Sequence, residues 1–164
     1  MSRFRLFAGI ALLTAVVSVS GMAPVAQSQD GSRRETIRFH SPDRKETIVD
    51  IDLNDDGDTD DAGDGELGYG PVFTRGEKTG SQRHECRTFK ATPKAFMLRC
   101  VGTFNVTGRG SIEVGGVFRF TRRGIQGAGL AVTGGAGEFR DAGGTMVLDA
   151  DNNSTDFEFR LIHH

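Results

Sequence analysis

The feature that most constrains the fold is a series of short segments in which apolar and polar residues alternate. In the clearest of them, at 155–163, Phe157, Phe159 and Leu161 share one face of an extended chain and charged residues occupy the other. Beyond the first 26 residues, no segment of helical length has the 3.6-residue apolar period of a helix. The pattern predicts an all-β protein.

Nine segments are predicted as strands, with turn residues between them. They are 35–40, 47–53, 71–78, 82–91, 94–106, 110–120, 127–133, 145–150 and 155–163. Consecutive strands joined by short turns favour an up-and-down meander, and a meander of this size commonly closes on itself to remove its edges. We therefore predict a closed antiparallel up-and-down β-barrel of about eight strands.

The N-terminus has the tripartite pattern of a secretory signal peptide. Arg3 and Arg5 form a basic start, an uncharged apolar stretch follows, and small residues precede a more polar sequence after Ala26. The apolar stretch is shorter than the roughly 18 to 20 residues of a membrane span. We expect a secreted protein, with cleavage after Ala26; Ala23 is disfavoured because Pro24 follows it. The expected organisation is a signal peptide at 1–26, a flexible leader at 27–34 and a barrel domain at 35–164 with an acidic loop insertion at 52–66.

The overall charge argues against polyanionic partners. The chain has a formal net charge of −2, and removing a signal peptide with two arginines would make it more acidic. An acidic protein has no general electrostatic attraction to nucleic acid or to anionic membrane surfaces. We expect no nucleic-acid partner and no membrane span in the mature form.

The two cysteines, Cys86 and Cys100, lie on segments that we expect to form a hairpin. If the turn is centred on Pro93, the two cysteines are equally distant from it and lie directly opposite each other. In an exported chain this register favours a Cys86–Cys100 disulfide, which would contribute about 3 kcal/mol by closing a loop of about 15 residues. Two free buried thiols are the alternative.

The same register places polar and apolar side chains together on one face of the hairpin. The candidate ligand-binding residues are Gln82, His84, Thr88, Phe96 and Phe104. If this face points into the barrel, polar groups in an apolar lumen form the usual construction of a small-molecule site. The alternatives are that the face points outward or that His84 is a hydrogen-bonded core histidine.

The stretch DIDLNDDGDTDDAGDGE, at 50–66, is the most charged part of the chain. Five oxygen-bearing residues occupy positions 1, 3, 5, 7 and 9 of an EF-hand-type calcium loop: Asp52, Asn54, Asp56, Asp58 and Asp60. Position 12 is Gly63, where a bidentate glutamate is expected, and no helices flank the loop. Calcium binding and a solvated acidic connector between strands are both compatible with this sequence.

A glycine-rich stretch, LAVTGGAGEFR at 130–140, first suggests a phosphate-binding loop. Such a loop requires a helix directly after the glycines, whereas here a turn and another alternating segment follow. We interpret the glycines as the tight turn between two barrel strands, with positive φ angles that favour glycine.

Three segments in order resemble the allene oxide cyclase-like and dirigent-like β-barrel superfamily. TGGAGEF at 133–139 is similar to its TGGTGRF-like motif, GSIEVGGVFRF at 110–120 to its G-x-I-x-x-x-G strand, and CVGTFNV at 100–106 to its C-x-x-T-F-x-L segment. The resemblance covers about 66–162 and, with the export signal, suggests a bacterial secreted member. Glu138 departs from the family's basic residue, and Asp141 begins a segment where the family has Gly-Ala-Arg.

The resemblance implies a barrel whose lumen binds a small apolar or phenolic molecule. Members that are enzymes steer cyclisation or coupling by confinement, without a metal or a covalent intermediate. An enzymatic member would be an isomerase or cyclase, but the catalytic residues of the family cannot be placed on this sequence. Homo-oligomers are common among such barrels. The alternative is a non-catalytic secreted binding or structural barrel, stabilised by its disulfide and by calcium, the one candidate cofactor.

Calorimetric titration of the mature chain with calcium separates the two interpretations of the acidic loop. A binding loop gives heat at or below millimolar calcium, the range of extracellular calcium modules. A solvated connector gives none, and that outcome removes calcium from the interpretation.

Overall fold

The computed structural model describes residues 31–53, 55, 57, 62–121, 124–126, 129–150 and 154–164. The expected signal peptide and the first half of the expected leader, 27–30, lie outside these residues. Within the described part of the chain, no helix is long and apolar enough to cross a membrane.

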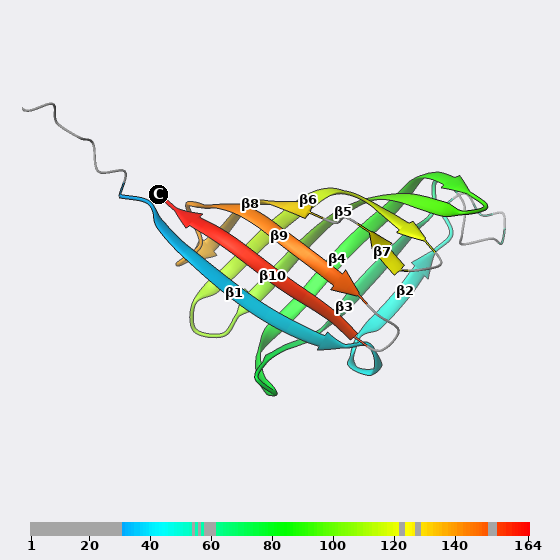
Figure 1. Ribbon diagram of the computed structural model, residues 1–164. Helices are drawn as coiled ribbons and strands as arrows, with labels where there is room; N and C mark the ends of the chain where they lie inside the picture. The colour runs from blue at the N-terminus through cyan, green and yellow to red at the C-terminus, as the bar shows by residue number, and fades with distance from the viewer. Residues whose placement is uncertain are drawn as a thin grey trace, which may run out of the picture. The chain divides into compact units, whose positions relative to one another are not determined.

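Strands account for nearly all of the described chain (Figure 1). The elements are β1 (Arg33–Pro42), the short 3-10 helix η1 (Asp43–Lys45), β2 (Thr47–Ile51), β3 (Gly65–Thr74), β4 (Glu77–Thr92), β5 (Ala95–Val106), β6 (Gly110–Thr121), β7 (Gly124–Gln126), β8 (Gly129–Gly137), β9 (Ala142–Ala150) and β10 (Ser154–His163).

The strands form a closed antiparallel barrel. Neighbours follow the order β1, β10, β9, β8, β6, β5, β4, β3, and β3 pairs again with β1 through His40 and Phe73, so eight strands complete a ring. β2 and β7 are additions, paired with β3 and β6 respectively. The predicted fold class is confirmed, including its strand number.

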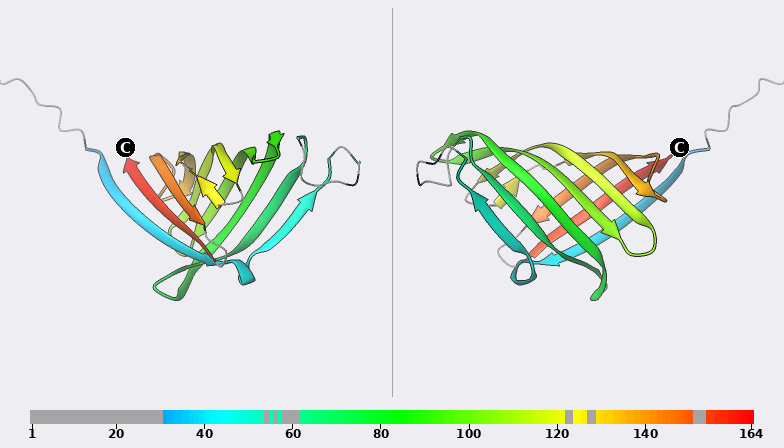
Figure 2. Two further views of the ribbon diagram at one scale, coloured as in Figure 1. Left: turned by 45° about the vertical axis from the view of Figure 1, so that its right-hand side comes forward. Right: turned by 180° about the vertical axis from the view of Figure 1, so that it is seen from behind.

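The ring parts at one corner because β1 and β2 behave as one interrupted strand along the edge of β3. β1 pairs with β10 over its whole length but meets β3 only at Phe73. After η1, β2 takes over the same edge of β3, from Thr47 opposite Tyr69 to Ile51 opposite Gly65. Figure 2 shows β1 and β2 diverging from this corner. The residues of the corner therefore stand at an opening of the barrel wall.

Two predicted boundaries around β3 are wrong. The segment 71–78 is not one strand, because the chain turns at Arg75 and Gly76, whose φ angles are 52° and 85°. β3 instead begins at Gly65, inside the stretch assigned to the acidic loop. The consequence for function is that Glu66 is a strand residue, opposite Cys86 on β4.

The glycines of LAVTGGAGEFR lie in β8, which corrects their assignment to a tight turn. β8 continues to Gly137, and the turn is formed by 138–141. Gly135 packs so closely against Ser111 of β6 and against Phe139 that a Cβ atom would overlap both. Only Gly137, with φ of 66°, initiates the turn. The absence of side chains lets the turn fold back and bury Phe139 completely.

The Cys86–Cys100 disulfide is confirmed, with the two residues paired across β4 and β5. The expected turn centre is half a residue off, because Thr92 pairs with Ala95 around a two-residue turn. A register shift between Thr88 and Lys90 compensates, so that the two cysteines still lie opposite each other.

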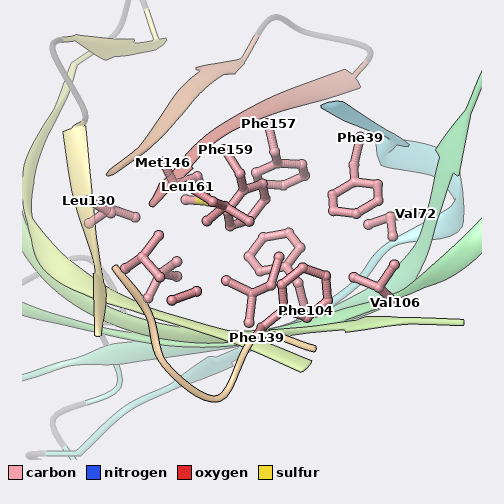
Figure 3. Close-up of a cluster of buried hydrophobic side chains, with 14 of the residues drawn as sticks. Phe39, Val72, Phe104, Val106, Leu130, Phe139, Met146, Phe157, Phe159 and Leu161 are labelled. Carbon is pink, nitrogen blue, oxygen red and sulfur yellow. The ribbon is translucent and has the colours of Figure 1, made fainter. Parts of the chain in front are cut away.

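A cluster of phenylalanines fills part of the barrel interior (Figure 3). The Phe104 ring lies 4.9 Å from the rings of both Phe157 and Phe159 in edge-to-face contact, and Phe39 lies 5.8 Å from Phe159. Edge-to-face packing places positive ring edges on negative ring faces and is favourable beyond the burial of area. The cluster is the hydrophobic core that holds β1, β5 and β10 together.

A charged network ties the two terminal strands to two turns. Arg109, before β6, donates to Glu35 of β1 at 2.8 Å and to Glu138 after β8 at 2.8 Å, and its guanidinium lies over the Phe139 ring. His163 of β10 is 3.0 Å from the Glu35 carboxylate. Hydrogen bonding from Arg109 is the main cause that lowers the pKa of Glu35, and the same bond raises the pKa of Arg109.

Replacement of Glu35 by glutamine should lower the free energy of unfolding by about 1 to 3 kcal/mol at pH 7, because a part-buried charge-assisted hydrogen bond is lost. A carboxylate with a lowered folded-state pKa stabilises the fold above its unfolded pKa of about 4.3, and this contribution is lost as pH falls through the folded value. Urea unfolding at pH 7 and pH 3 should therefore show a difference between wild type and Glu35→Gln that shrinks in acid. The matched control is Glu85→Gln, because Glu85 forms a more exposed ion pair with Arg87. It should change the free energy of unfolding by less than about 0.5 kcal/mol. If Glu35→Gln lowered the free energy of unfolding equally at pH 7 and pH 3, the stabilising role of the ionised Glu35 carboxylate would be contradicted.

Candidate functional site

The barrel encloses a cavity of about 480 Å³ beside the phenylalanine cluster. Phe104 and Phe157 belong to both and form the floor of the cavity. Its apolar walls come from β5 to β10 and are formed mainly by Val114, Phe118, Phe120, Ile125, Leu130, Met146 and Leu148. The volume lies within the roughly 300 to 1,000 Å³ of ligand-binding cavities.

The polar side chains of the cavity gather on the remaining side, at the corner where β1 gives way to β2. They are Asp43, Glu46, Glu66, Gln82 and His84, from η1, the residue before β2, β3 and β4. Thr155 of β10 adds a hydroxyl group to the wall. The cavity therefore has an apolar wall and a polar wall, and a bound molecule would be oriented by the difference between them.

His84 is held within a chain of hydrogen bonds. Gln82, which is 2% exposed, donates its amide to Glu46 Oε1 in a short hydrogen bond. Its carbonyl oxygen lies 3.0 Å from His84 Nδ1. Because a carboxylate only accepts, the Gln82 amide must point toward Glu46, and the Gln82 oxygen then accepts from Nδ1–H of the imidazole. In the neutral ring this leaves Nε2 with a lone pair, 3.5 Å from Glu66 Oε1.

A glycine on one of the two neighbouring strands makes room for the imidazole of His84. His84 pairs with Gly68 on β3 and with Gly102 on β5. A Cβ atom at Gly68 would overlap the His84 ring itself, whereas at Gly102 it would lie 3.6 Å from the His84 Cβ. The ring therefore lies over Gly68, and this glycine is part of the site.

The predicted ligand-binding residues divide between two hollows. Gln82, His84 and Phe104 line the main cavity. Thr88 and Phe96 line a separate hollow of about 110 Å³. The hairpin face that carries them does point inward, whereas ligand binding by these residues stays a prediction.

Glu46 and Glu66 are the site residues that the sequence analysis missed. The sequence analysis places Glu66 in the acidic loop because it starts the third predicted strand at residue 71, whereas β3 starts at Gly65. Glu46 belongs to the interruption between β1 and β2, which no periodicity marks. The pairing of Glu66 with Cys86, which no feature of the sequence indicates, places His84 and Glu66 on neighbouring strands and on one face.

Among the residues that the structure describes, one group of side chains has the spacing of a metal site, formed by Glu66, His84 and Cys86. The Cys86 sulfur is bonded to Cys100 and cannot act as a thiolate, so the group has two protein ligands and not three. Of the five candidate calcium ligands, Asp52 is described, and its carboxylate accepts the backbone N–H groups of Asp55 and Gly57 at 2.6 and 2.8 Å. The other four lie outside the described residues, and calcium binding stays a prediction.

No protein-family model matches the sequence, and no curated protein matches it. Solved structures do match. A pyocyanin demethylase has a TM-score of 0.61 and 20% identity, over 79% of this chain and 99% of its own. Two dirigent proteins described as pterocarpan synthases have TM-scores of 0.61 and 0.60 at 13% identity, over 81% and 80% of this chain and 86% and 96% of theirs.

The chain has the dirigent-like barrel fold. The resemblance read from the sequence motifs is confirmed at the level of the fold, over almost the whole length of the matched structures. At these identities the match shows the fold alone, so function has to be argued from the cavity.

Proposed function

We propose that the lumen of this barrel binds one small apolar or phenolic molecule. The observation that carries the proposal is the cavity of about 480 Å³ with apolar walls and a single polar side at His84. Binding would bury the apolar body of the ligand against the phenylalanine floor, and its polar group would meet His84 Nε2.

The same arrangement suits a reaction in which a phenol or enol proton is transferred. His84 Nε2 would accept the proton, Gln82 would hold the opposite ring nitrogen, and the Glu66 carboxylate would stabilise the resulting imidazolium. The apolar walls would restrict the conformers of the bound molecule, and such restriction favours cyclisation or coupling without a covalent intermediate.

Secretion is part of the proposal. The disulfide fits an extracellular protein, since disulfides persist in oxidising compartments. The N-terminal pattern of basic, apolar and small residues gives the route.

A structural barrel without a ligand is the second candidate. The phenylalanine cluster supports it, because the cluster and the disulfide would stabilise the barrel whether or not a ligand binds. The two candidates differ in whether the cavity takes up small molecules from water.

Binding can be tested with the uncharged fluorescent probe N-phenyl-1-naphthylamine. We expect saturable binding of one probe per chain, seen as an increase in fluorescence. Thr155 lines the cavity, so Thr155→Trp should fill part of it and weaken binding at least about 10-fold, because the probe loses buried apolar contacts. Thr145, exposed on β9, provides the matched control Thr145→Trp.

Two outcomes would support the structural barrel instead. One is the absence of saturable binding in the wild-type protein. The other is equal binding in both tryptophan variants.

The role of His84 can be tested by competition between 2-naphthol and naphthalene. We expect 2-naphthol to bind about 2- to 12-fold more tightly, the range of one net hydrogen bond. His84→Leu should remove this preference, and Gly68→Ala should reduce it, because the added methyl group displaces the ring. A preference that survives in His84→Leu would show that the hydroxyl binds elsewhere.

A further inference from the structure

The charges that line the cavity have one sign. Apart from His84, the ionisable groups described in its wall are the carboxylates of Asp43, Glu46 and Glu66. The adjoining hollow adds Asp50 and shares Glu66. Within the described part of the chain, neither hollow has a lysine or arginine in its wall.

The two glutamates have no permanent positive charge as a counter-ion. Glu46 is 3.7 Å from His84 Nδ1 with a side chain only 9% exposed, and Glu66 is 3.5 Å from Nε2. Among the described residues, neither glutamate forms a salt bridge with a lysine or an arginine. The hydrogen bond to Gln82 places a proton on Nδ1 of His84 in either charge state of the ring, so His84 provides no permanent positive charge. The Glu66 side chain is 36% exposed, whereas the Glu46 carboxylate is held out of water beside an apolar cavity, which is costly unless hydrogen bonds, such as the one from Gln82, or a cation compensate it.

The apolar wall also favours positive charge. Four phenylalanines contribute to it, namely Phe104, Phe118, Phe120 and Phe157. The face of an aromatic ring carries negative electrostatic potential and attracts cations most strongly where water is excluded. Carboxylates and ring faces thus select the same kind of ligand from opposite sides of the cavity.

We propose that the preferred ligand of the lumen is an apolar organic cation, such as a flat aromatic ring system with a quaternary or protonated nitrogen. This inference rests on the proposed function and specifies its ligand class. The ring system occupies the phenylalanine side, and the positive nitrogen lies toward Glu46 and Glu66. A metal ion does not fit this description, because most of the wall offers it no oxygen or nitrogen ligand. Anionic molecules of the same size are disfavoured by the carboxylates.

Three fluorescent probes with three fused rings test the charge preference. They are N-methylacridinium, a cation; acridine at pH 8, where it is uncharged; and anthracene-9-carboxylate, an anion. We expect the cation to bind at least about 10-fold more tightly than acridine, as a desolvated cation–π contact allows. The anion should bind more weakly than either.

Isosteric glutamine variants locate the charge effect. Glu46→Gln and Glu66→Gln should each weaken binding of N-methylacridinium about 5-fold or more by removing one attractive charge, and leave acridine binding unchanged. Glu85→Gln is the control, because Glu85 is on the same strand as His84 but exposed on the outer surface. It should leave all three affinities unchanged.

The outcomes separate this inference from the proposed function. If acridine or the anion binds as tightly as the cation, the charge preference is overturned and lumen binding stands. Equal weakening of acridine and N-methylacridinium by the glutamine variants would also overturn it, since the effect would then not depend on ligand charge. If none of these probes and no N-phenyl-1-naphthylamine binds, the proposed function itself fails.

Discussion

The structure depends on how the first strand closes the barrel. β1 satisfies the edge of β10 along its full length but reaches β3 at a single residue pair, and β2 then completes the edge of β3. Unpaired strand edges are unfavourable, and a closed ring removes them. Strand pairing is interrupted at η1 because one stretch of chain, β1 to β2, pairs first with the edge of β10 and then with the edge of β3. The interruption also opens the wall and brings Asp43 and Glu46 to the cavity.

The interior has a densely packed part and a hollow part. The rings of Phe39, Phe104 and Phe159 pack against one another and supply the buried apolar area that a barrel of this size needs. On the other side of Phe104 and Phe157, the interior contains the cavity of about 480 Å³. The charged network around Glu35 and Arg109 joins both terminal strands to two turns, so the side chains around the cavity are not required to hold the chain ends in place. The polar side of the cavity can therefore contain Glu46, Glu66 and His84 without loss of the contacts that hold the chain ends.

Much of the fold was predictable, because period-two alternation survives in single strands such as 155–163, and the cysteines fix the register of a hairpin without further information. The site was predictable only in part. His84 and Gln82 follow from that hairpin, whereas Glu46 comes to the cavity through a break in strand pairing that leaves no local pattern. The prediction of a tight turn at 134–137 is wrong for a related reason. Glycine occurs both where φ is positive and where two backbones or a ring approach closely, and the sequence does not distinguish these two cases.

The disulfide has a second consequence beyond loop closure. Cys86 is two residues from His84 on β4, and Cys100 is two residues from Gly102 on β5, all on the inner face. Paired strands can slip against each other wherever their alignment is weakly specified. A slip of β5 by two residues would bring Cys100 or Phe104 beside His84 in place of Gly102. The covalent bond forbids that slip, and so keeps Gly102, which lines the cavity without a side chain, beside His84.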